Sequence, residues 1–337
     1  MKAAVFYKPY DIRIEERAVP KYGKNDILIK VRAAGICGTD VHIFSGDFDV
    51  SAPLIIGHNC SGEVEAVGDD VKDFRKGDRV MVEPVRSCGE CFYCRIGRYN
   101  ICSRRVLPGI EKDGIFAEYA AVPSRHVFKF SEKVSFEEAA AMEPAAVALH
   151  ALEFAKPSIG EQIAIIGQGP IGLFHTQIAR LCGLKTIAID LIPYRLELAK
   201  KFGADYVVDA QQSDPVKEVV SLTGRGADIV LESSGSVKGV KLTTKLARPV
   251  GRIVIVGSSR ELLKHGPNSE EILTKELTVY GVAGSPGKYP LAMDLASEGK
   301  IDVKSLITHR FSLEEIRRAL ETTRKKDENV MISLIIP

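Results

Sequence analysis

Four of the seven cysteines lie within fifteen residues and have the spacing of a metal site. Cys88, Cys91, Cys94 and Cys102 follow the pattern C-x₂-C-x₂-C-x₇-C. Two-residue spacers allow thiolates to converge on one tetrahedral ion, and zinc closed by four cysteines is structural rather than catalytic. The segment is too small to bury a core, so we expect the metal to replace one. An iron–sulfur cluster or four free thiols are the alternatives.

A second set of metal-binding residue types is spread over three separate stretches. Cys37 lies in GICGTDVHIFSG, His58 in IIGHNC, and Glu143 in the otherwise apolar AAAMEPAAVALHAL. A zinc ion held by a thiolate, an imidazole and a carboxylate keeps its fourth position open for water or substrate. The residues alone leave another interpretation open, because His58 could be a core histidine and Glu143 could cap the following helix.

A glycine motif predicts a dinucleotide site. Gly167, Gly169 and Gly172 form G-x-G-x-x-G between an apolar β-rich run and an amphipathic helix that begins near Pro170 and Ile171. The first glycine permits the tight turn, the second lets the backbone approach a pyrophosphate, and the third allows close packing of helix and strand. The free N–H groups of the helix N-terminus would bind the phosphates.

Asp190 ends the next predicted strand, eighteen residues after Gly172. Its carboxylate would accept hydrogen bonds from the adenosine ribose and repel a 2′-phosphate, so we expect NAD rather than NADP. Arg195 could lie near the same ribose and weaken that preference. The alternative is a Rossmann-like sheet that binds something other than a dinucleotide.

The surrounding segments predict an α/β fold with two kinds of domain. Roughly the first 150 residues are short β-rich runs separated by Gly and Pro. From about residue 155, apolar strands alternate with segments of helical period, which predicts right-handed βαβ units and a doubly wound parallel sheet. The tail predicts a helix at 312–326 and a final strand at 330–337.

Composition excludes several classes of function. The 337 residues suffice for roughly two domains. Lys and Arg number 46 and Asp and Glu 44, so there is no basic excess to bind nucleic acid. We expect no membrane span, because no apolar run reaches the required ~18 residues. The N-terminus lacks the apolar region of a signal peptide, and we therefore expect a cytoplasmic protein whose clustered cysteines bind metal.

These motifs, in their order, resemble the zinc-dependent medium-chain dehydrogenases of the alcohol dehydrogenase superfamily. The resemblance covers the whole chain, through GICGTDVH, SGEVEAVG, GDRV, the four cysteines, DGIFAEYAAV, EPAAVALHA, the glycine motif and ITHRFSLEEI. The glutamate of EPAAVALHA points to the sorbitol or polyol branch, since alcohol dehydrogenases themselves have a cysteine at that ligand position.

The resemblance implies a fold of two domains. A GroES-like β-rich catalytic domain would comprise 1–152 and 290–337, with a structural zinc lobe at 86–104, and a Rossmann NAD-binding domain would comprise 153–289. The substrate would bind in the cleft between them. Homodimers and homotetramers are usual in the family.

The resemblance also assigns roles to individual residues. It implies a catalytic zinc, additional to the structural one, held by Cys37, His58 and Glu143. Thr39 would hydrogen-bond the substrate oxygen, and His42 would pass its proton to solvent by way of the cofactor ribose. Asp40 would orient a ligand, or have a purely structural role in the turn.

The implied reaction is the NAD-dependent oxidation of a secondary alcohol or polyol to a ketone. Threonine 3-dehydrogenase and 2,3-butanediol dehydrogenase are the nearest alternatives. A zinc-free quinone reductase or a non-catalytic binding protein on the same fold is a further one, and those proteins lack the catalytic zinc ligands.

One residue departs from the family pattern. The polyol branch usually has a glutamate after the histidine, where this chain has Asn59. The missing carboxylate makes the site one unit more positive, so we hypothesise that the zinc here is a stronger Lewis acid and that its bound water or alcohol has a lower pKa. Alternatively, Asn59 only completes a hydrogen-bond network.

Overall fold

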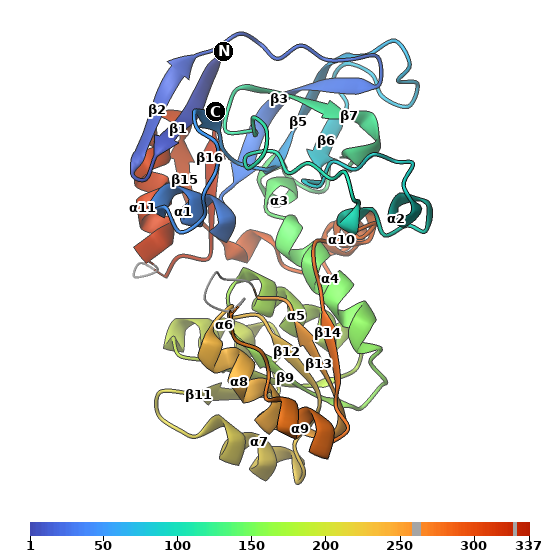
Figure 1. The fold of residues 1–337 in the computed structure, drawn as a ribbon, viewed down its shortest axis with the longest axis vertical. Coiled ribbons are helices and arrows are strands. Elements are labelled where there is room, and N and C mark those ends of the chain that lie inside the picture. Colours follow the sequence, from blue (N-terminus) through green and yellow to red (C-terminus); the bar gives the residue numbers. More distant parts are fainter. Residues whose placement is uncertain (258–263, 326–328) are drawn as a thin grey trace. The chain divides into compact units, whose positions relative to one another are not determined.

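Contacts divide the protein into two units in the computed structural model, which describes residues 1–257, 264–325 and 329–337 (Figure 1). Unit 1 comprises Met1–Glu143 and Tyr289–Pro337, and unit 2 comprises Pro144–Lys288. The chain thus enters unit 2 at the start of helix α4 (Glu143–Ala155). The domain boundaries given above stay predictions.

Unit 1 is built on a seven-stranded sheet with the order β15-β16-β3-β5-β6-β8, in which β7 also pairs with β3. A second sheet has the order β2-β1-β4. The strands are β1 (Lys2–Lys8), β2 (Asp11–Glu16), β3 (Asp26–Gly35), β4 (Leu54–Ile55), β5 (Asn59–Val67), β6 (Arg79–Val82), β7 (Tyr119–Pro123), β8 (Val127–Lys129), β15 (Ile307–Ser312) and β16 (Ile332–Ile336).

The helices of unit 1 are short and lie between these strands. They are α1 (Gly38–Ser45), α2 (Phe92–Arg95), α3 (Phe136–Ala140), α10 (Tyr289–Ser297) and α11 (Ile316–Lys325), with 3₁₀ turns at Tyr99–Ile101, Ser124–His126, Lys304–Leu306 and Leu313–Glu315. The predicted tail helix corresponds to the last of these turns and α11, and its final position, 326, lies outside the described residues.

The core of unit 1 explains why β3 is central. Seven of its ten residues are buried and two are partly buried, and Ile27, Ile29 and Val31 pack in one apolar cluster with Phe44 of α1 and Ile335 of β16. Removal of this aliphatic surface from water stabilises the sheet and fixes the strand end from which α1 begins.

Unit 2 confirms the predicted doubly wound sheet. Its six strands are parallel and have the order β11-β10-β9-β12-β13-β14. The order reverses between β9 and β12, which is where α/β proteins of this topology bind ligands, at the carboxyl ends of the strands. The strands are β9 (Gln162–Ile166), β10 (Lys185–Asp190), β11 (Tyr206–Asp209), β12 (Ala227–Glu232), β13 (Ala247–Ile255) and β14 (Thr278–Gly281).

The helices of unit 2 follow the strands in alternation. They are α5 (Pro170–Leu181), α6 (Pro193–Lys201), α7 (Pro215–Thr223), α8 (Val237–Leu246) and α9 (Ser269–Thr274). Three of them have proline at the first turn, where an N–H has no helical partner to lose. No helix among the described residues has the length and apolarity to span a membrane.

Candidate active site

Helix α1 places the first candidate ligand, Cys37, at its N-cap. Cys37 N–H donates a hydrogen bond of 2.8 Å to Asp40 Oδ2, and the two residues form a capping box. Gly46, with φ of 83°, ends the helix in the left-handed conformation. A thiolate at this N-terminus would be stabilised by the helix dipole, which suits a metal ligand.

Asp40 also faces the second candidate ligand. Its Oδ1 lies 3.3 Å from Nδ1 of His58, and both residues are buried. Burial opposes the charged imidazole, but the charge of the nearby Asp40, together with the Cys37 thiol, outweighs it and holds the pKa of His58 well above its usual value. An imidazole whose Nδ1 faces a carboxylate is oriented to offer Nε2 to a metal.

Glu143 stands at the start of α4 and is half-buried. Burial raises the pKa of its carboxyl, the charge of Asp40 adds to this rise, and that of His58 opposes it. The three candidate ligands thus lie in one unit, and His58 is within electrostatic reach of both Cys37 and Glu143. Among the described residues they do not form a group whose ligand atoms all lie within 4.8 Å of one another. Their joint binding of zinc stays a prediction.

The predicted proton-transfer residues lie on one helix. Thr39 and His42 are three positions apart on α1, so they share a face. The Cys37 thiol donates to Thr39 Oγ1 at 3.9 Å, which places that hydroxyl beside the candidate ligand. The His42 side chain is 47% exposed, and its Nδ1 lies 3.6 Å from Asp47 Oδ2. It therefore has access to solvent.

Asn59, the departure from the family pattern, is the first residue of β5 and pairs with Gly35 at the end of β3. Its side chain is buried, and its Oδ1 has no hydrogen-bond partner among the described residues. Asp40 Oδ1 and His58 Nδ1 share that property, because their 3.3 Å contact lacks hydrogen-bond geometry. Unpartnered buried polar atoms on Asp40, His58 and Asn59, together with a Cys/His/Glu donor set, fit a bound cation.

The four-cysteine group does converge. All four sulfur atoms lie within 4.8 Å of one another. Four of the six Sγ–Sγ distances are 3.4, 3.5, 3.7 and 3.8 Å. Zinc–sulfur bonds of about 2.3 Å in a tetrahedron require sulfur atoms ~3.8 Å apart. The lobe has the dimensions of a zinc site.

The electrostatics of the lobe also suit a cation. The Cys94 and Ser103 backbone N–H groups, with the neighbouring thiols, hold the pKa of Cys91 down to about 6, although burial opposes them. Burial raises the pKa of Cys94 to about 11. Four adjacent thiols cannot all ionise without a positive charge, and a zinc ion supplies it.

A buried polar network that the sequence did not reveal joins this lobe to the sheet. The backbone N–H of Ser87, next to the first cysteine, donates to His126 Nε2 at 3.0 Å. His126 Nδ1 lies 3.9 Å from Glu83 Oε2, and that oxygen accepts the Tyr99 hydroxyl at 2.9 Å. Because Ser87 and His126 are 39 positions apart, only the folded chain brings them together.

The glycine motif has the geometry of a dinucleotide turn. Gly167 has φ of 88°, and a Cβ on Gly172 would lie 1.8 Å from Gly167 O. A Cβ on Gly169 would meet nothing within 4 Å, so open space lies before the helix N-terminus. Pro170 and Ile171 form the first turn of α5, where backbone N–H groups are free to bind phosphate.

Asp190 is held rigidly at the end of β10. Its Oδ2 accepts from Gln168 N–H at 2.5 Å, and its Oδ1 accepts from the N–H groups of Leu191 and Ile192 at 2.7 and 2.9 Å. Gln168 occupies a position that the motif leaves unspecified, and its backbone N–H joins the glycine turn to the Asp190 carboxylate. Arg195 is half-buried on α6.

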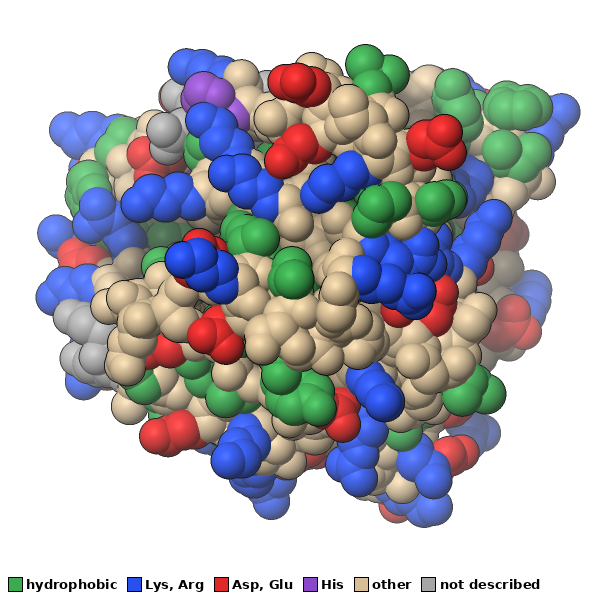
Figure 2. Space-filling view, turned by 90° about the horizontal axis from the view of Figure 1, so that it is seen from below, with side chains coloured by type: hydrophobic (Ala, Val, Ile, Leu, Met, Phe, Trp, Pro, Cys, Tyr) green, Lys and Arg blue, Asp and Glu red, His purple; other side chains and the backbone are tan. Residues whose placement is uncertain are grey.

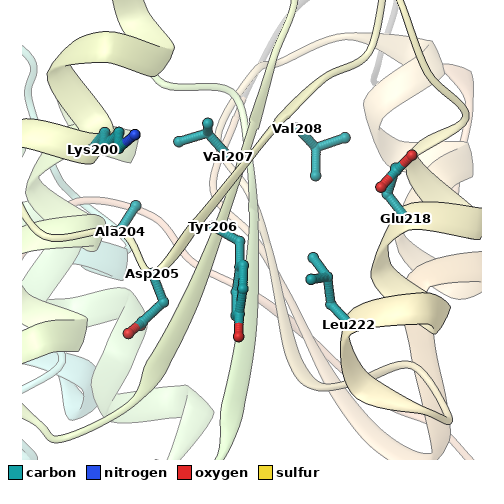
Figure 3. Close-up of a pocket in the computed structure, with 8 residues that line it drawn as sticks. All are labelled: Lys200, Ala204, Asp205, Tyr206, Val207, Val208, Glu218 and Leu222. Carbon is teal, nitrogen blue, oxygen red and sulfur yellow. The ribbon is translucent and has the colours of Figure 1, made fainter.

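A pocket elsewhere in unit 2 is distinct from this turn. It has a volume of about 260 Å³ and lies along edge strand β11 (Figure 3). Its lining residues are Lys200, Ala204, Asp205, Tyr206, Val207, Val208, Glu218 and Leu222. It contains neither the glycine motif nor Asp190.

On the face shown in Figure 2, Lys and Arg side chains are interspersed with Asp and Glu.

Comparisons with known proteins identify the family of this chain. Residues 23–132 match the family model described as the alcohol dehydrogenase GroES-like domain, and residues 170–298 match that of zinc-binding dehydrogenases. The chain is 36% identical to sorbitol dehydrogenase of Bacillus subtilis (strain 168) over 346 residues, covering 100% of this chain and 97% of that protein. It is 36% identical to L-threonine 3-dehydrogenase of Bacillus licheniformis over 318 residues, or 91% and 90% of the two chains.

The crystal structure of a zinc-binding dehydrogenase from Sinorhizobium meliloti 1021 bound to NADP superposes with a TM-score of 0.93 at 34% identity, covering 100% of this chain and 99% of that one. These matches confirm the predicted GroES-like and Rossmann folds and the predicted cofactor classes. The chain is a member of the zinc-dependent medium-chain dehydrogenases of the alcohol dehydrogenase superfamily, oxidoreductases that use NAD(P) and zinc.

Proposed function

We propose that this dehydrogenase oxidises a secondary alcohol or polyol to a ketone, with NAD as the hydride acceptor. The observation that carries the proposal is the contact of Asp40 with both Cys37 and His58 at the N-terminus of α1, with Glu143 in the same unit. A thiolate, an imidazole and a carboxylate suit a catalytic zinc with an open position.

The chain's own residues have distinct parts in this proposal. Cys37, His58 and Glu143 would hold the catalytic zinc, and Asp40 would orient the imidazole. The chemistry that the bound zinc and dinucleotide supply is the acidification of an alcohol and the acceptance of its hydride. Thr39 would accept the hydrogen bond of the substrate hydroxyl, and the exposed His42 would release the proton to water.

The preference for NAD rests on Asp190. Three backbone N–H groups donate to its two oxygens, so the carboxylate would be held in one orientation, where it would face an approaching 2′-phosphate. Arg195, nearby on α6, is the residue that would favour residual NADP use. We further propose a cytoplasmic homodimer or homotetramer, as the family resemblance implies.

One pair of measurements tests the proposal. Zinc content should be close to two ions per chain, and NAD reduction should be screened over polyols, secondary alcohols, inositols and threonine. His58→Ala should abolish turnover, reduce zinc to one ion per chain and leave NADH binding intact. Cys182→Ser, which removes a thiol outside both metal sets, should leave zinc and turnover unchanged.

The alternatives give different results. Threonine or 2,3-butanediol as the preferred substrate would narrow the class without changing the site. One zinc per chain in the parent enzyme would leave only the structural site and favour a reductase or binding protein without a catalytic zinc. Activity retained in His58→Ala would refute the assignment of the catalytic residues.

A further inference from the structure

His175 is a buried histidine that the proposed chemistry leaves unused. It lies on α5, one turn beyond Gly172, and its side chain is inaccessible to solvent. Its Nδ1 lies 3.0 Å from Oγ of Ser233. Its Nε2 is buried and has no hydrogen-bond partner in the part of the chain that the structure describes. A buried polar atom without a partner is uncommon and calls for an explanation.

Ser233 lies at the dinucleotide turn. It directly follows β12, and its N–H donates to Ile166 O at 2.9 Å, one residue before Gly167. The next residue, Ser234, packs so closely that a Cβ on Gly167 would be 2.8 Å from its Cα. The Ser233 side chain is half-buried, at the carboxyl edge of the sheet where the strand order reverses.

The tautomer of His175 determines whether the Ser233 hydroxyl donates its hydrogen bond to the ring or to another group. Burial lowers the pKa of His175 to about 3, so the ring is neutral and has one donor and one acceptor nitrogen. With the proton on Nε2, an N–H donor would be buried without an acceptor, and the Ser233 hydroxyl would donate its hydrogen bond to Nδ1 of the ring. With the proton on Nδ1, the ring donates to Ser233 Oγ and only an acceptor remains unpaired. Orphaned buried N–H groups are the rarer case.

We propose that His175 donates from Nδ1 to Ser233 and thereby leaves the Ser233 hydroxyl as a hydrogen-bond donor to an acceptor oxygen of the bound dinucleotide. His175 is then a positioning residue and Ser233 a cofactor-binding one. Both belong to unit 2, so the inference depends on membership in the NAD(P)-dependent family and not on the proposed alcohol substrate.

NADH binding to the full-length enzyme tests the pair. The chain contains no tryptophan, so the change in NADH fluorescence on binding is measured without interfering tryptophan emission. Loss of one hydrogen bond should raise the Kd for NADH about two- to tenfold in Ser233→Ala and in His175→Leu. The double variant should bind no more weakly than either single one, because both changes act through the same Ser233 hydroxyl.

Matched variants separate positioning from packing. His175→Asn retains an amide donor at the position of Nδ1 and should keep the Kd within about twofold of the parent. His150→Leu removes an equally buried histidine of unit 2 and should lower Tm without changing the Kd. Additive effects in the double variant, or a His175→Leu enzyme that loses only Tm, would overturn the proposal.

The tautomer is measured in the protein without cofactor. Long-range ¹H–¹⁵N spectra record the ring signals of the seven histidines, and the signal that is absent in His175→Asn is that of His175. This signal should show a neutral ring with its proton on Nδ1. A proton on Nε2 would refute the inference even if His175→Leu fails to fold, and Ser233→Ala would still report on the hydroxyl.

Discussion

The second and third glycines of the dinucleotide motif should respond differently to the same added methyl group. In Gly172→Ala the new Cβ would lie 1.8 Å from Gly167 O, whereas real Cβ contacts essentially never fall below 3.0 Å. The helix or the turn must therefore move by at least about 1.2 Å. Overpacking of this kind costs roughly 2 kcal/mol, which for a unit of this size lowers Tm by roughly 4–8 °C.

In Gly169→Ala the methyl group meets no atom within 4 Å, and the φ of −71° is ordinary for alanine. Stability should therefore stay within about 1 °C of the parent. The methyl group instead fills the space that a pyrophosphate must enter, so the Kd for NADH should rise at least about tenfold. Gly172→Ala should weaken NADH binding as well, because the displaced carbonyl belongs to the turn.

Differential scanning calorimetry gives Tm, and NADH fluorescence titration gives the Kd. The expected pattern is a loss of stability and affinity in Gly172→Ala and a loss of affinity alone in Gly169→Ala. The reasoning fails if Gly172→Ala melts with the parent, or if Gly169→Ala binds NADH normally, since the open space would then not be the phosphate site.

Three further changes test separate parts of the molecule. Asp228 accepts hydrogen bonds from Gln162 N–H and Arg248, which hold its pKa below the usual value despite burial, so it stabilises the fold above about pH 4 and loses this effect as the pH falls through its folded pKa. Asp228→Asn should therefore lower the free energy of unfolding at pH 7 by about 1–3 kcal/mol. In urea titrations, this difference from the parent should shrink toward about pH 3. Cys94→Ser should reduce zinc from two ions per chain to one by atomic absorption, and unchanged content would exclude the lobe as a metal site. Asn59→Glu should shift the alkaline-side pKa of turnover upward, because it restores a negative charge beside His58; a lower or unmoved value would contradict the charge argument.

The sequence predicted best those features that depend on neighbours along the chain. The turn at Gly167, the helix start at Pro170 and the convergence of the four cysteines require only local spacing, and the structure shows each of them. Local spacing fixes these features because backbone geometry over a few residues leaves little freedom.

Features that depend on tertiary contacts could not be predicted from the residue pattern alone. Glu143 and His58 are joined as a candidate pair only through the family resemblance, since no period or spacing relates residues that far apart. The contact between Ser87 and His126, which holds the zinc lobe to the sheet, had no signal at all, because a histidine in a β-rich run is equally compatible with a core position.

Asp40 shows why the location of a charge matters more than its presence in a motif. From the sequence, a role in orienting a ligand and a role in the turn were equally good interpretations. The structure places one oxygen on the Cys37 N–H and the other beside His58 Nδ1, so the same carboxylate caps the helix and faces the imidazole. Loss of the charge in Asp40→Asn would therefore weaken the cap and remove the partner of His58 together. The two interpretations are not alternatives, because the helix N-terminus that needs the cap is also the element that presents the first candidate ligand.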